Sequence, residues 1–417
     1  FTQHVAQFSP TSVIATEPNS FDARQLLQRL GVDTVESNQF LCHTSLFAQF
    51  SDGKKSMKME DFYRWQRKRL GYLMDGDKPV GGEWNFDKDN REPPPRTDTN
   101  RWPQPLVTPL DNVDNEVLAL LPSSCWGAPP NGLWATSRKH ALQRLDHFIT
   151  HVLPSFGPHE DAMLSDNWHL AHSLLSPYLN NGLLLPAEVC DAAEAAYKKG
   201  LVPINSVEGF IRQIIGWREF IWNSYWKHMP AYRDENALNA MRNLPALFTD
   251  PSKTKMRCLQ KSLHAIYENS YAHHIQRLMV LGNFALISGI NPQQFTEWMW
   301  NSFIDAAEWV MVPNVVGMTL YADGGRLATK PYASGGAYID RMSDYCKGCH
   351  FDRKKRVGED ACPFTTLYWD FMLRHQTAFV KNPRIAQQVR AAQRLSDTDE
   401  LQQRAAEVLQ LLDTGNL

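Results

Sequence analysis

Apolar residues recur at three- and four-residue spacing through most of the chain after residue 133. In SVEGFIRQIIGWREFIWNSYWKHMP (206–230), the apolar positions that share one face are Phe210, Ile214, Trp217, Ile221 and Tyr225. This periodicity predicts an amphipathic helix. Strand patterns are few after residue 135, and the polar stretch 385–412 also has a helical period. We therefore expect the larger, C-terminal part of the chain to be helical.

A second helical stretch, NPQQFTEWMWNSFIDAAEWVM (291–311), carries its own start signal. Asn291 is predicted as the N-cap, Pro292 as the first helical residue and Gln294 as the capping-box partner. On a continuous helix, Asp305 would lie on one face with residues 298, 302 and 309, two of which are tryptophans. A carboxylate among tryptophans needs a partner, because an unpaired buried charge is costly.

The preceding helical stretch offers that partner. His273 and Arg277 are four residues apart and share a face, with His274 at its edge. We predict an Arg277–Asp305 ion pair, either purely structural or part of a binding site. The segment AHSLLSPYLNNG (171–182) places serine hydroxyls near a helix start, which fits either a helix cap or a phosphate site.

The first part of the chain has a different pattern. TSVIATEP (11–18) and TVESNQFLCH (34–43) read as strands, and FDARQLLQRLGV (21–32) reads as an amphipathic helix that ends at a glycine. Gly, Pro, Asn and Asp are dense between residues 75 and 132. We expect the end of an α/β domain at 1–74, a linker and loop at 75–132, and a helical domain at 133–417.

Composition adds two constraints. The 417 residues are 43% hydrophobic and 21% charged with a net charge of −2, typical of a globular protein without an overall nucleic-acid-binding charge. We see no apolar run of transmembrane length and no signal peptide, and we expect a cytoplasmic prokaryotic protein. Because the chain begins at Phe1, we expect it to lack some N-terminal sequence.

Three of the seven cysteines form the pattern C-x2-C-x12-C: Cys346, Cys349 and Cys362. Such pairs bind either zinc or an iron–sulfur cluster. A zinc site would take His350 or His375 as its fourth ligand, although His350 adjoins Cys349 and is poorly placed. Cys258, far upstream, could instead complete a set of four cysteines. Cys362 precedes a proline, as is common for cluster ligands.

Several motifs together resemble the FAD-binding half of the photolyase/cryptochrome family. They are SLLSPYLNNG (173–182), GWREF (216–220) and the separation of Arg277 from Asp305. The four cysteines, with segments 73–95 and 308–318, resemble the prokaryotic iron–sulfur branch that contains bacterial (6-4) photolyases. This sequence departs from the family at Leu174, where many relatives place an arginine, and at Met311, where relatives carry Asn or an acid near the flavin.

The resemblance implies an α/β plus all-α architecture: a truncated Rossmann-like antenna domain, then a helical FAD-binding domain with a four-cysteine [4Fe–4S] cluster. It implies FAD ligands at Ser173, Leu174, Leu175, Ser176, Arg218, Arg277, Asp305 and Asn314. It implies cluster ligands at Cys258, Cys346, Cys349 and Cys362. A lumazine-type antenna chromophore is also implied, with most of its pocket outside this chain.

The implied activity is light-driven electron transfer from reduced FAD to a flipped-out (6-4) photoproduct in UV-damaged DNA. His274 would be the main acid and His273 would assist, because histidine donates protons near neutral pH. Tyr332 and Tyr338 would orient the imidazole or line the lesion pocket. Trp298 would be the first residue of an electron path, with Trp309 behind it.

Basic loops are the candidate DNA contacts. Lys88, Arg91 and Arg96 lie in a proline-stiffened loop, and Arg353 and Lys354 begin the basic run between the cysteines. Asp87 and Asp89 in the first loop fit either Mg²⁺ or solvent. We expect a monomer. The rival interpretations are a signalling cryptochrome without repair activity and a non-enzymatic iron–sulfur or zinc DNA-binding module.

Overall fold

A computed structural model describes residues 1–54, 57–95, 97, 101–122 and 124–417. Its short strands are β1 (Ile14–Thr16), β2 (Asp33–Val35), β3 (Met74–Asp75) and β4 (Lys78–Pro79). Its α-helices are α1 (Thr2–Phe8), α2 (Phe21–Arg29), α3 (Thr44–Ser51), α4 (Met59–Leu70), α5 (Asn112–Leu120), α6 (Arg138–His147), α7 (Ser176–Asn181), α8 (Pro186–Lys198), α9 (Ile204–Ile211), α10 (Glu219–His228), α11 (Arg257–Asn269), α12 (Asn283–Ser288), α13 (Pro292–Ser302), α14 (Glu308–Val312), α15 (Gly336–Met342), α16 (Pro363–Arg374), α17 (Gln376–Phe379), α18 (Ala386–Ala392) and α19 (Thr398–Thr414).

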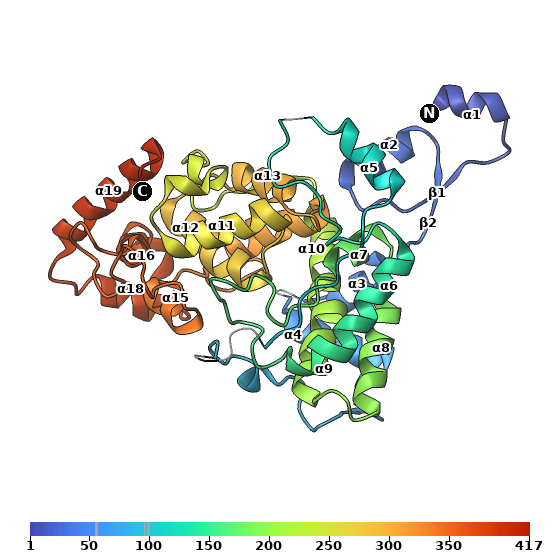
Figure 1. Cartoon of the computed structure of the whole chain (residues 1–417), viewed down its shortest axis with the longest axis horizontal. Coiled ribbons are helices and arrows are strands. Elements are labelled where there is room, and N and C mark those ends of the chain that lie inside the picture. The colour runs from blue at the N-terminus through green and yellow to red at the C-terminus, as the bar shows by residue number, and fades with distance from the viewer. Residues whose placement is uncertain (55–56, 96, 98–100, 123) are drawn as a thin grey trace.

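The helices form two groups along the long axis of the molecule (Figure 1). Helices α15, α16, α18 and α19 gather at one end, and α6, α8 and α9 gather at the other. The N-terminal segment with β1 and β2 extends beside the second group. The helical character predicted after residue 133 is confirmed.

The N-terminal segment forms a small parallel β–α–β unit. Strand β1 pairs in parallel with β2, and α2 connects them. Ser20 caps α2 by accepting from Ala23 N, and Gly31, at φ 67°, lets the chain turn into β2. The first strand and the helix are confirmed with shorter bounds than predicted, and the second strand, β2, overlaps the predicted stretch 34–43 only at residues 34 and 35. The assignment of this unit to a Rossmann-like domain stays a prediction.

The predicted helix at 206–230 is confirmed as a continuous helical run with a π-helical segment, Arg212–Arg218, between α9 and α10. Three further π-helical segments are Phe148–Val152 after α6, Gln276–Gly282 before α12 and Pro313–Thr319 after α14. Three of the four contain one predicted cofactor residue each, at position 218, 277 or 314, and Phe148–Val152 contains none. Such widened turns are frequent at functional sites.

Glycines allow two of these π-helical segments to approach each other. A Cβ atom added to Gly282 would lie 2.0 Å from Cγ2 of Thr319. One added to Gly317 would lie 2.2 Å from the hydroxyl of Tyr232. No other residue type leaves space for these contacts, so Gly282 sets the distance between the two π-helical segments, and Gly317 sets the distance from its segment to Tyr232.

Helix α13 corrects two expectations. Asn291 caps it as predicted, accepting from the amides of residues 293 and 294. Gln294 does not complete a capping box, because its Oε1 accepts from Leu244 N. The helix ends at Ser302, and Asp305 lies in the turn before α14. Asp305 therefore does not share a continuous helical face with the tryptophans, because Phe303 leaves the helix in an extended conformation.

Two large apolar cores hold the helices together. One lies among α10–α16, α18 and α19, and the other lies among α4, α6, α8 and α9. Helix α4 precedes the predicted boundary at residue 74, yet Tyr63 donates to Glu208 at 2.7 Å and packs on Gly216. The boundaries at 74 and 132 stay predictions. In the described residues, no helix is long and apolar enough to cross a membrane.

Candidate active site

Arg277 and Asp305 form a bidentate ion pair. Nη1 and Nη2 of Arg277 lie 3.0 Å from Oδ1 and Oδ2 of Asp305. Ser176 Oγ donates to Oδ2 at 2.7 Å, and Asn180 Nδ2 donates to the backbone carbonyl of Asp305 at 2.8 Å. The predicted ion pair is confirmed, and α7 holds its carboxylate in place.

The other predicted cofactor residues lie around α7, with one exception. Leu174 has φ 56°, an unusual conformation for leucine, and Ser173 Oγ accepts from Leu175 N at 3.3 Å. Arg218 is buried and donates to the carbonyls of residues 39 and 179. The exception is Asn314, whose Nδ2 donates to Val310 O within its own helical run.

Three histidines meet beside this ion pair. The rings of His172 and His273 stack with centroids 4.3 Å apart and planes at 12°. His274 is half exposed, and its Nε2 lies 3.3 Å from Oδ1 of Asp161. Burial acts to lower the pKa of His274, but the hydrogen bond and charge of Asp161 outweigh it and raise that pKa. His273 is fully buried, with a pKa well below the usual range because of that burial.

Sequence reasoning missed three members of this group: Glu160, Asp161 and His172. They lie in the irregular segment 157–175, where no periodicity marks them. The available signal was an acidic pair followed by two histidines three residues apart, at 169 and 172. Burial raises the pKa of Glu160 to about 7, so this carboxyl can hold a proton near neutral pH.

The two predicted tyrosines are both partly buried and pack against the same apolar core. Burial raises the pKa of Tyr338, on α15, and the charges of Asp161 and Arg91 act on it. It therefore lies near the partner of His274. Tyr332 is half-buried and packs against the C-terminal apolar core. The catalytic role of either residue stays a prediction.

Acidic neighbours neutralise most of the predicted DNA contacts. Arg91 lies 3.3 Å from Asp87, which also binds Arg212, and Lys88 lies 3.9 Å from Glu83. The carboxylate of Asp87 thus already has two cationic partners, so it is less suited to bind Mg²⁺. Arg96 lies outside the described residues.

The basic run between the cysteines is also paired. Arg353 lies 2.7 Å from Asp340, Lys355 is 2.5 Å from Asp360, and Arg356 bonds Asp397 twice through Nε. Lys354 is the one member with no ion pair to a described residue. The run is therefore largely a structural turn, and its binding of phosphate stays a prediction.

The four cysteines 258, 346, 349 and 362 line one small cavity and carry no disulfide. Cys258 reaches it from α11, and Cys362 caps α16. Among the described residues, the histidine cluster is the one set of three donor atoms within 4.8 Å of one another, so no three of the thiol sulfurs all lie within that distance of one another. Zinc–sulfur bonds of about 2.3 Å would bring four thiolates within about 4 Å.

The two predicted electron-transfer tryptophans are both buried. Trp298 donates from Nε1 to Phe248 O at 3.0 Å. Trp309 lies edge-on to Phe40 with ring centroids 5.0 Å apart and under the guanidinium of Arg218 at 5.1 Å. Their role in electron transfer stays a prediction, since core packing explains both positions.

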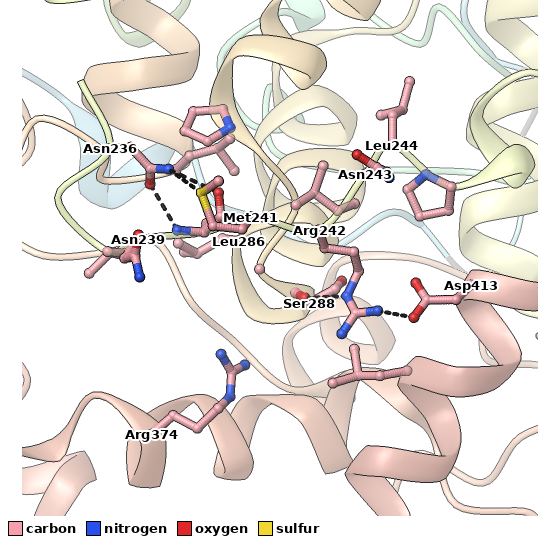
Figure 2. Close-up of a pocket in the computed structure, with 18 of the residues that line it drawn as sticks. Asn236, Asn239, Met241, Arg242, Asn243, Leu244, Leu286, Ser288, Arg374 and Asp413 are labelled. Atoms are coloured by element: carbon pink, nitrogen blue, oxygen red, sulfur yellow. Dashed lines mark hydrogen bonds and ion pairs between the residues drawn. The ribbon is translucent and has the colours of Figure 1, made fainter. Parts of the chain in front are cut away.

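The largest of the cavities described, about 610 Å³, lies away from all of these residues (Figure 2). Arg242 and Arg374 enter it from opposite sides, and Arg242 pairs with Asp413 of α19. By contrast, the cavity lined by His172, Ser173 and Leu174 has a volume of only about 30 Å³. The predicted cofactor segment is thus closely packed in this conformation.

Comparisons with known proteins indicate the class of fold. Residues 1–129 match the family model described as deoxyribodipyrimidine photo-lyase-related protein. A crystal structure of a bacterial class III photolyase from Agrobacterium tumefaciens has a TM-score of 0.55 at 17% identity and covers 99% of this chain and 82% of that one. The cryptochrome of Synechocystis has a TM-score of 0.50 at 14% identity, covering 82% of this chain and 70% of that one. The fold is therefore photolyase-like.

A sequence relative narrows the class further. A protein of Agrobacterium fabrum named (6-4) photolyase is 44% identical over 421 residues, which are 98% of this chain and 82% of that protein. The chain belongs to the photolyase/cryptochrome family. Membership in this family implies FAD as the cofactor.

Proposed function

We propose that this protein is a (6-4) photolyase that repairs pyrimidine–pyrimidone photoproducts in UV-damaged DNA under blue or near-ultraviolet light. The relative named (6-4) photolyase matches nearly the whole chain. The observation that carries the proposal is the half-exposed His274 held by Asp161, because such a repair needs a proton donor at the surface that meets DNA.

The residues around α7 fit FAD. In the described structure, buried donors without a partner include Nε of Arg218 and Nε1 of Trp309. These donors lie near the Arg277–Asp305 pair and suit the oxygen- and nitrogen-rich edges of a flavin nucleotide. Ser173 and Ser176 would contact the phosphates, and Arg277 with Asp305 would hold the polar edge of the ring. Bound FAD supplies light-driven one-electron chemistry.

Because the cavity beside Ser173 is only about 30 Å³, binding of FAD would require the residues that line it to rearrange. Leu174 cannot supply the charge that arginine gives in many relatives. The backbone amides of this segment and the two serine hydroxyls would therefore take a larger share of phosphate binding.

The protein's own groups would handle the proton. Asp161 orients the His274 ring and favours its protonated form, so His274 can donate to the lesion. His273 is too deeply buried to touch DNA directly and would act by packing behind His274. Tyr338 would line the lesion pocket near Asp161. Lys354, which has no ion pair to a described residue, is the basic residue best placed for a phosphate contact, whereas Arg91 would have to exchange Asp87 for phosphate.

We propose a [4Fe–4S] cluster at the four cysteines. Their convergence on one cavity supports a shared group, and a multi-iron cluster is favoured over a single zinc ion because no three thiol sulfurs all lie within 4.8 Å of one another. The cluster would link α11 to the C-terminal helices. A lumazine-type antenna chromophore, a cytoplasmic location and a monomeric state complete the proposal.

Replacing His274 tests the function directly. We expect His274→Ala to lower repair of (6-4)-containing DNA under blue light by 100-fold or more, because the proton donor is lost. Binding of the same DNA in the dark should change less than threefold. His140→Ala, on the first turn of α6, is the matched control. Absence of light-dependent repair in the unchanged protein, with intact FAD, would favour the signalling cryptochrome.

Replacing Cys258 tests the cluster. We expect Cys258→Ser to lose most of its iron and sulfide, while Cys125→Ser, at an exposed cysteine, retains both. Elemental analysis and the visible spectrum measure the result. If Cys258→Ser kept the iron content of the unchanged protein, the fourth ligand would lie elsewhere, and the alternative of a zinc site would again have to be considered.

A further inference from the structure

The histidine cluster has unused ligand atoms in a buried position. One ring nitrogen from each of His172, His273 and His274 lies within 4.8 Å of the others. Within the described part of the chain, Nε2 of His172 and both ring nitrogens of His273 have no hydrogen-bond partner. Their residues are 8% and 0% exposed. Buried polar atoms without a partner are costly and rare, so the cluster lacks a component.

We propose that His172, His273 and His274 form a binding site for a divalent transition-metal cation of the zinc type, and that its occupancy withdraws His274 from proton donation. The second half of this proposal rests on the proposed function. The site is separate from the four cysteines and from the aspartates of the 85–95 loop.

The donor chemistry suits zinc. Three histidines with an open fourth position are a common zinc-binding set. Ligating histidines usually donate their second ring nitrogen to a carboxylate, which orients the ring. Asp161 provides that carboxylate at Nε2 of His274, which leaves Nδ1 of His274 for a cation. Magnesium and calcium prefer oxygen ligands and would not compete well here.

The surrounding charges also favour a cation. The rings of His172 and His273 are buried, and a buried environment favours the neutral imidazole that binds metals. The carboxylates that face the cluster are Asp161 and Glu160. The nearby positive charge is Arg277, which Asp305 already neutralises. The remaining titratable neighbour, His169, has its Nδ1 bonded to the carbonyl of Leu170.

Binding requires one ring to turn. The planes of His172 and His273 are nearly parallel, so their in-plane lone pairs do not meet at one point. Because the ring of His273 makes no hydrogen bond to a described residue, it can rotate about its Cβ–Cγ bond without breaking one.

The test is calorimetric titration of ZnCl2 into the FAD- and cluster-loaded protein in the dark, without DNA. We expect one zinc per chain, with affinity lowered at least tenfold in both His172→Gln and His274→Gln. The half-exposed His274 makes the second variant a safe substitute if the first misfolds. His151→Gln is the matched control, because His147 and His151 form a separate pair with ring centroids 5.1 Å apart; its affinity should be unchanged.

Three results would overturn the site: no zinc binding, an affinity in both histidine variants equal to that of the unchanged protein, or release of iron in step with zinc uptake, which would assign the zinc to the cysteines. The binding measurement needs neither light nor lesion, so it stands if the repair function fails. In a repair assay, a saturating concentration of zinc should lower the repair rate of the unchanged protein at least tenfold, and that of His151→Gln by the same factor. Undiminished repair would overturn the inhibitory half.

Discussion

Two adjacent groups of buried polar side chains differ in how fully they are hydrogen-bonded. In the Arg277–Asp305 group, both carboxylate oxygens accept hydrogen bonds, one of them from Ser176 as well. In the His172–His273 stack, three ring nitrogens have no partner among the described residues. Complete pairing makes a fixed support, whereas incomplete pairing marks a place that takes up a proton or a ligand.

Breaking the paired group should have the largest effect. Arg277→Leu would leave the buried Asp305 carboxylate without its counter-charge, and we expect a loss of about 3–5 kcal/mol in the free energy of unfolding. Urea denaturation measures it. Arg326→Leu, which breaks an exposed pair with Glu235, is the control and should cost less than about 1 kcal/mol. A similar small loss in both would mean that Asp305 does not depend on Arg277.

The pH dependence of stability should come next. Because Glu160 holds its proton up to about pH 7 in the folded state, the unfolded state releases that proton at lower pH. Stability from this group is therefore full below about pH 4 and is lost as pH rises toward 7, by up to about 3 kcal/mol. Glu160→Gln should flatten the difference between urea midpoints at pH 5 and pH 7.5. An unchanged difference would show that Glu160 ionises normally.

The smallest effect is expected in the stack. His273→Leu replaces two unpaired nitrogens with apolar atoms of similar volume, so stability should stay within about 1 kcal/mol or rise slightly. His169→Leu is the matched control, because His169 Nδ1 bonds Leu170 O at 3.1 Å, and its loss should be larger. A loss above about 2 kcal/mol for His273→Leu would mean that the ring has a partner in solution.

The features that could be predicted from the sequence are those that depend on local residue patterns. Helical periodicity predicted the run at 206–230, and the N-cap at Asn291 followed from its position before a proline. The Arg277–Asp305 pair was predicted correctly, because a buried carboxylate needs a cationic partner, although the predicted helical face shared with the tryptophans was wrong. The turn that interrupts the helix at Asp305 was not, because tertiary contacts hold Asp305 against α7 and no glycine or proline marks the break.

Contacts between distant segments explain what the sequence did not show. Asp161 and His274 are 113 residues apart, and nothing in either segment indicates the other. The same holds for the basic run, whose charges face Asp340 and Asp397 from separate helices. When only the sequence is considered, a cluster of like charges suggests that the protein binds an oppositely charged ligand. Here the opposite charges lie elsewhere in the same chain.

The π-helical segments make the site sensitive to chain length as well as to residue type. Each widened turn contains one residue more than an α-helical turn would. Deleting one residue from any of these segments would restore a regular helix and rotate everything beyond it by about 100°. Arg218, Arg277 or Asn314 would then face another direction with its identity unchanged. Length variants in these three segments are therefore expected to be rarer among functional relatives than point substitutions.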